Sequence, residues 1–107
     1  MKIRVSEHAK FRPDKMAKIA LATTSRCQLD LYCLEPGQDQ KAHAHDDQDK
    51  IYFVLDGRGR VVVGGETETL EAGEAIVAPA GAVHGIANDG SGPLTVLVIV
   101  TPPPPHA

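Results

Sequence analysis

Apolar and polar residues alternate along most of this chain, with the period of two that is typical of β-strands. After Arg26 the odd positions from Cys27 to Cys33 are apolar, whereas the even positions Gln28 and Asp30 are polar. Successive side chains of a strand point to opposite faces. The segment therefore predicts a strand whose odd positions are buried.

Short segments of the same kind follow at regular intervals, separated by turn signals. Asp56-Gly57, Gly64-Gly65 and Asn88-Asp89-Gly90 are typical of tight turns, since glycine and asparagine accept positive φ angles. Regular short strands predict an all-β sandwich or barrel without a long helix. The expected strands cover residues 51–55, 60–63, 66–70, 75–78, 84–87 and 94–100.

The two ends of the chain are less regular. Pro13 leaves room for little more than one helical turn before residues 16–23, which are typical of an edge strand. Prolines 102–105 cannot donate to a strand ladder, so the tail at 102–107 marks the end of the fold. We expect one domain over residues 1–107.

Composition and charge exclude several classes of partner. The net charge is −3 and the basic residues are scattered. No stretch is basic enough to contact successive phosphates of a nucleic acid, so nucleic-acid binding is not expected. No apolar run reaches the roughly 18 residues of a membrane span, and the N-terminus lacks the apolar stretch of a signal peptide. We expect a cytoplasmic protein with no membrane partner.

The two cysteines predict no disulfide. Cys27 and Cys33 would lie about 20 Å apart on one strand at ~3.3 Å per residue, which is too far for an S–S bond. We interpret both as reduced, buried packing residues.

Histidines supply the candidate chemistry. His43 and His45 stand two residues apart, which places both imidazoles on one face of a strand. The turn Pro79-Ala80-Gly81 reverses the chain just before His84 and would bring its ring to the same place. Three neutral imidazoles favour a divalent transition metal such as Fe, Mn, Ni, Cu or Zn.

Two spaced motifs around these histidines resemble those of the cupin superfamily of small β-barrels. The first, a glycine, His-x-His, a glutamate and a glycine, is matched over about residues 37–57 by Gly37, His43, His45 and Gly57. The second spans about residues 73–88 and is matched at every position, by Gly73, Pro79, Gly81, His84 and Asn88. The resemblance implies a small single-domain cupin with a double-stranded β-helix, or jelly-roll, barrel.

The glutamate of the first motif is missing. Counting back from Gly57 places Lys50 in its position, and the alternative spacing places Asp49 there. A shift of one residue turns a strand over, so the sequence leaves open which of the two points inward. Gln48 or Asp47 could also supply an oxygen ligand if the preceding loop folds inward.

The resemblance leaves the activity open, because cupins include enzymes and binding proteins. The leading hypothesis is a metal site formed by His43, His45 and His84 that binds or acts on a small oxygen-rich molecule, as a dioxygenase, isomerase or decarboxylase would. The alternative is a non-catalytic small-molecule sensor, with or without metal. No catalytic residue is identified. The strand at 94–100 is apolar on both faces, which predicts a homodimer.

Overall fold

The computed structural model describes residues 1–44 and 46–104, and the described part is almost entirely β-structure. The all-β prediction is therefore confirmed, and the expected strands match the observed ones closely. The elements are η1 (Val5–His8), β1 (Ala17–Thr23), β2 (Gln28–Leu34), β3 (Asp39–His43), β4 (Asp49–Asp56), β5 (Arg58–Val63), β6 (Glu66–Glu71), β7 (Ala75–Ala78), β8 (His84–Ala87) and β9 (Leu94–Thr101).

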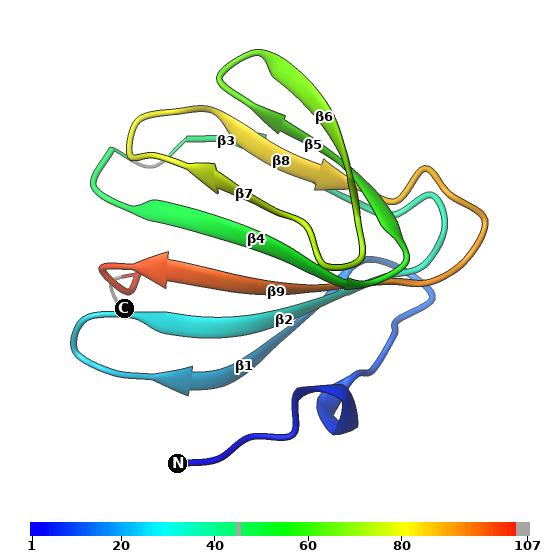
Figure 1. Ribbon diagram of the computed structural model, residues 1–107, viewed down its shortest axis with the longest axis horizontal. Coiled ribbons are helices and arrows are strands. Elements are labelled where there is room, and N and C mark those ends of the chain that lie inside the picture. The colour runs from blue at the N-terminus through cyan, green and yellow to red at the C-terminus, as the bar shows by residue number, and fades with distance from the viewer. Residues whose placement is uncertain (45, 105–107) are drawn as a thin grey trace.

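Two antiparallel sheets face each other (Figure 1). The five-stranded sheet has the order β1-β2-β9-β4-β7, and the four-stranded sheet has the order β3-β8-β5-β6. The predicted edge strand β1 lies at one end of the larger sheet. Chain segments that are distant in sequence, such as β2 and β9, thus become neighbours, and the interior between the sheets collects side chains from the whole chain.

Turn residues act as the sequence predicted. Gly64 and Gly65 have φ angles of 59° and 87° and join β5 to β6 as a two-residue hairpin in which Val63 pairs with Glu66. Gly81 has a φ of 85°, and the amide of Ala82 donates to the carbonyl of Pro79 at 3.0 Å. This closed turn sets the start of β8 at His84.

The main core lies between the sheets. It is built from inward-facing residues of six strands: Tyr32, Leu34, Tyr52, Val54, Val61, Leu70, Ile86, Leu94, Val96, Val98 and Val100. On β2 and β4 these are the even positions, because side chains alternate across a strand.

The predicted burial of the odd face of β2 is confirmed at Leu31 and Cys33, although it is the even face that points into the main core. Leu31 and Cys33 are buried, but they pack with Ala17 in a second cluster outside the barrel, against Val5 and Ala9 of the N-terminal segment. A strand that is covered on both faces buries both sets of side chains, so its alternation does not tell which set points inward. Both cysteines are free; Cys33 is buried, whereas Cys27 is only partly buried.

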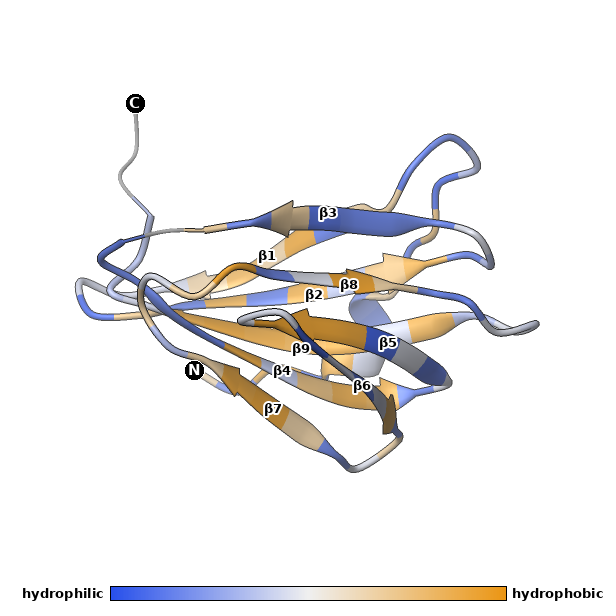
Figure 2. Cartoon of the chain, turned by 90° about the horizontal axis from the view of Figure 1, so that it is seen from above, coloured by the Kyte–Doolittle hydropathy of each residue, from blue (hydrophilic) through white to orange (hydrophobic). Residues whose placement is uncertain are grey.

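The outer face of the larger sheet is apolar beyond this covered patch. Ile51, Phe53, Leu97 and Ile99 are half-buried there, and Val77 is 57% exposed. Figure 2 shows β9 as hydrophobic along its length and β3 as mostly hydrophilic. Among the described residues, no helix is long and apolar enough to cross a membrane.

Candidate functional site

A cavity of about 120 Å³ opens between the two sheets. It lies at the end of the barrel where β3 ends and β4 and β8 begin. Its described wall is formed by six residues with polar side chains, Lys18, Gln40, His43, Gln48, Lys50 and His84, and by Val100 and Pro104.

Two of the three predicted histidines meet in this wall. His43 of β3 and His84 of β8 are directly opposite each other in the antiparallel ladder, and their ring centroids lie 4.5 Å apart. A register irregularity of β3 between Gln40 and His43 precedes this pair. The strand pairing thus brings together histidines that are far apart in the sequence.

Both rings are oriented by the same kind of hydrogen bond. Nδ1 of His43 lies 2.9 Å from the carbonyl oxygen of Lys41, and Nδ1 of His84 lies 3.1 Å from that of Ala82. A carbonyl oxygen only accepts, so Nδ1 carries the proton, and a neutral ring then has its lone pair on Nε2. Metal-ligating histidines are commonly fixed in this way.

His45 lies outside the described residues. The described strand β3 ends at His43, and the prediction that His43 and His45 share one strand face stays a prediction. Over residues 1–44 and 46–104, no three His, Cys, Asp or Glu side chains are grouped as a metal site. The described residues therefore contribute two imidazoles to the predicted set of three.

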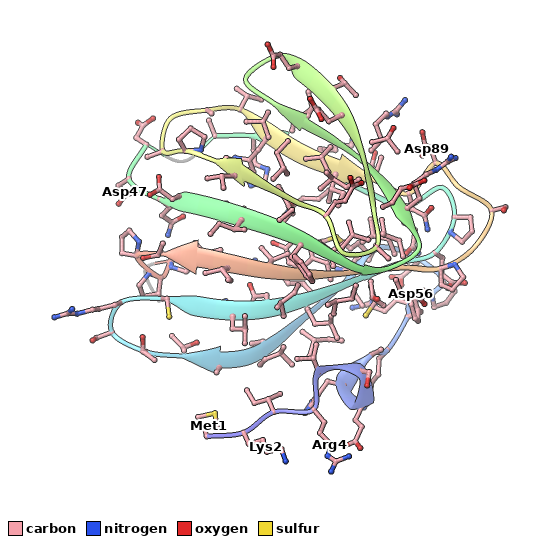
Figure 3. The ribbon with its side chains drawn as sticks, viewed as in Figure 1. Met1, Lys2, Arg4, Asp47, Asp56 and Asp89 are labelled. Carbon is pink, nitrogen blue, oxygen red and sulfur yellow. The ribbon has the colours of Figure 1, made fainter. Side chains whose placement is uncertain are left out.

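The position of the missing glutamate is taken by Lys50. Its side chain points into the cavity and is only 5% exposed. Asp49 points outward and accepts a 2.8 Å hydrogen bond from the amide of Ala80, while Gln48 is buried in the cavity wall. Figure 3 shows Asp47 at the end of the barrel where β4 begins. Of the alternatives that the sequence left open, Lys50 and Gln48 face the site.

The ammonium group of Lys50 is held among aromatic rings. Nζ lies 5.2 Å from the ring centroid of Tyr32 and 5.3 Å from that of Tyr52, and it donates to Oε1 of Gln40 at 3.3 Å. Burial, followed by repulsion from the Lys18 ammonium, lowers the pKa of Lys50 to about 8, and the Asp30 carboxylate partly opposes this. Lys50 is therefore mainly charged at neutral pH.

Gln40 connects the polar side chains behind the cavity. Its Oε1 accepts a 3.0 Å hydrogen bond from the Tyr52 hydroxyl, and its Nε2 donates to the Tyr32 hydroxyl at 3.2 Å. Burial raises the pKa of Tyr32 to about 12 and raises the pKa of Tyr52 further above its usual value. Both phenols are thus neutral hydrogen-bonding groups rather than bases.

A buried carboxylate lies deeper in the barrel. Asp30 is fully buried, and both of its oxygens accept from Nε2 of Gln28, at 2.9 and 3.0 Å. The alternation in β2 predicted these two residues on the polar face, yet that face points inward. Lys18, Gln40 and Asp30 are the site residues that sequence reasoning missed, because nothing in their local sequence indicates that they face the same interior.

Comparison with known proteins finds similarity in both sequence and structure. Residues 30–100 match the family model of the cupin domain. The crystal structure of TT1209 from Thermus thermophilus has a TM-score of 0.94 and 44% identity, and the match covers 97% of this chain and 100% of TT1209. The double-stranded β-helix fold implied by the motifs is confirmed by these similarities.

Two sequence relatives cover the same region. The uncharacterized protein SCO3923 of Streptomyces coelicolor is 41% identical over 75 residues, which are 68% of each chain. The tetracenomycin polyketide synthase protein TcmJ of Streptomyces glaucescens is 35% identical over 73 residues, which are 68% of this chain and 49% of TcmJ. The chain thus spans about half the length of TcmJ.

Proposed function

The chain belongs to the cupin family, and on this premise we propose that its cavity holds a transition-metal ion and binds a small oxygen-rich organic molecule beside it. One observation carries the proposal. His43 and His84 face each other across two strands, and each is fixed by an Nδ1 hydrogen bond to a backbone carbonyl. With the proton on Nδ1, Nε2 is the nitrogen through which each of these wall residues would bind a metal ion.

The donor set fits a transition metal better than calcium or magnesium. His43 and His84 would hold the ion together with His45, which lies outside the described residues. Neutral imidazoles suit Fe, Mn, Ni, Cu or Zn, whereas Ca²⁺ and Mg²⁺ prefer oxygen ligands. When bound, such an ion would supply Lewis-acid polarisation of a carbonyl group, or O₂ chemistry if it is iron.

The side chains around the histidines would orient the organic ligand. Lys50 and Gln48 present N–H donors to the cavity, and Lys18 lies at its exposed mouth. Val100 and Pro104 add apolar surface to the same wall. Convergent polar groups on a partly apolar wall are typical of small-molecule sites.

A second candidate function is a non-catalytic binding or sensing protein. Lys50 favours it, because an ammonium in the glutamate position repels a divalent cation and weakens metal binding in the empty site. In this reading the cavity binds its ligand through Lys50 and the amides, and the histidines contribute hydrogen bonds.

Elemental analysis tests the metal proposal. The protein is purified without chelator or nickel resin, and it is then exposed anaerobically to Fe(II), Mn(II), Ni(II) or Zn(II). We expect about one equivalent of a single metal per chain, reduced strongly in His43→Ala and in His84→Ala but unchanged in the control His8→Ala, whose side chain is exposed. Circular dichroism checks that each variant is folded.

Two results would contradict the metal proposal. One is metal content that stays unchanged in both cavity variants. The other is a wild-type protein that binds none of the four metals, which would leave the non-catalytic binding protein as the better description.

A further inference from the structure

Two lysines line the cavity. Lys50 lies inside and Lys18 at the mouth, and both ammonium groups lie near one ring, at 5.2 and 5.9 Å from the centroid of Tyr32. Among the wall residues that the structure describes, none is Asp or Glu. The wall is therefore positively charged, and a metal ion on the histidines would add to this charge.

The nearest buried carboxylate does not neutralise Lys50 directly. Asp30 accepts from Gln28 through both oxygens, and the ion pairs found in the described part of the chain do not include Lys50. An ammonium has three N–H donors, and Gln40 accepts one from Lys50. Buried charges are ordinarily paired, so Lys50 has both the charge and the donors for an anionic ligand.

We propose that the cavity recognises a small organic carboxylate, held by the ammonium of Lys50 inside and by that of Lys18 at the mouth. This inference rests on the proposed function, because it assigns the ligand class of the same cavity. The carboxylate accepts hydrogen bonds from Lys50, and the amide of Gln48 lies in the same wall as a further donor. Charge-assisted bonds of this kind are among the stronger hydrogen bonds in proteins.

Size restricts the ligand further. The cavity measures about 120 Å³, whereas pockets for drug-sized ligands measure about 300–1,000 Å³. A carboxylate with a short carbon chain fits this volume, and a nucleotide or an oligosaccharide does not. A neutral polyol would leave the charge of the buried Lys50 side chain without an anionic partner in the ligand, which disfavours a polyol relative to an acid.

Calorimetric titration of metal-free protein tests the inference. The probes are malonate and its neutral analogue malonamide, with inorganic phosphate as a second anion. We expect malonate to bind at one site per chain and malonamide not to bind. Lys50→Met should weaken malonate binding by about ten- to a hundredfold, the effect of losing a charged hydrogen bond. Lys18→Met should weaken it about two- to fivefold, as expected of an exposed ion pair.

The control is Lys41→Met, which removes an exposed lysine of β3 that is not in the cavity wall and should leave binding unchanged. Three results would overturn the inference: no malonate binding at millimolar concentration, equal binding by Lys50→Met, or equally tight binding of malonamide or phosphate. Because the titration uses metal-free protein, its result does not depend on whether the metal proposal is correct. A protein that binds metal but not malonate would contradict only the carboxylate inference.

Discussion

Replacing Lys50 by methionine should stabilise the folded protein at neutral pH, although it removes a hydrogen bond. The ordinary lysine pKa of 10.5 falls to about 8 in the folded state, chiefly because of burial. At about 1.4 kcal/mol per pH unit, this difference corresponds to a destabilisation on the order of 3 kcal/mol at pH 7. Methionine has a similar length and no charge, so it avoids this penalty.

Some favourable contacts are lost in the same variant. The ammonium lies near two aromatic rings and donates to Gln40, contacts that are worth about 0.5–1 kcal/mol each. Oε1 of Gln40 still accepts from Tyr52, so no acceptor is left unsatisfied by the change. Together the three contacts offset about 1.5–3 kcal/mol of the penalty, so the expected net gain in the free energy of unfolding is at most about 1.5 kcal/mol at pH 7.

The stability gain of Lys50→Met over the wild type should decrease as the pH rises above about 8. Between pH 8 and 10.5 the unfolded chain retains the Lys50 proton that the folded protein has released. Wild-type stability attributable to Lys50 therefore rises with pH through this window, and the advantage of Lys50→Met shrinks. Stability is best compared below pH 10. Above pH 10 the buried Tyr32, whose pKa is raised to about 12, makes the folded protein less stable as the pH rises.

Urea denaturation from pH 7 to 9.5, at one protein concentration, measures both quantities. Lys41→Met, which removes an exposed lysine, is the matched control and should change stability by less than about 0.5 kcal/mol. A less stable Lys50→Met at pH 7, or a difference from wild type that does not change with pH, would refute the reasoning. Higher stability combined with weaker malonate binding is the result expected of a residue that is retained for binding rather than for stability.

Three further outcomes are expected. Asn88→Ala should lower the free energy of unfolding by about 2–4 kcal/mol, because the buried amide donates to two backbone carbonyls at 2.9 Å; a loss under about 0.5 kcal/mol in urea would contradict this role. Gly57→Ala should destabilise much more than Gly37→Ala in the same assay, since both have a φ of 87° but only at Gly57 would the new methyl group overlap the carbonyl oxygen of Pro93; equal losses would contradict the steric argument. Self-association through the apolar outer face predicts a wild-type dimer in sedimentation velocity and a shift to monomer in Leu97→Asp, and a monomeric wild type at micromolar concentration would exclude it.

The strands and turns could be predicted because their signals are local. Period-two alternation located β2, and Gly64-Gly65 located the β5–β6 hairpin with its positive φ angles. The spacing of Pro79, Gly81 and His84 likewise predicted the turn that delivers a histidine to the site. Each of these signals depends only on residues close together in the chain.

Which side chains of each strand point into the barrel could not be predicted from such local signals. On β4 the odd positions are the more apolar, yet Lys50 and Tyr52 point inward, because the outer face of this sheet is also apolar. Lys18 and Asp30 reach the interior through the pairing of β1, β2 and β9. Long-range pairing therefore decides the composition of the cavity.

The most direct test of the central claim is the tautomeric state of His43 and His84, read from long-range ¹H–¹⁵N NMR correlations with and without Zn(II). The hydrogen bonds to the carbonyls of Lys41 and Ala82 predict a proton on Nδ1 of each ring, and one equivalent of Zn(II) should shift the Nε2 resonance of both. Rings protonated at Nε2, or Nε2 resonances that do not respond to Zn(II), would contradict a metal site at this wall of the cavity.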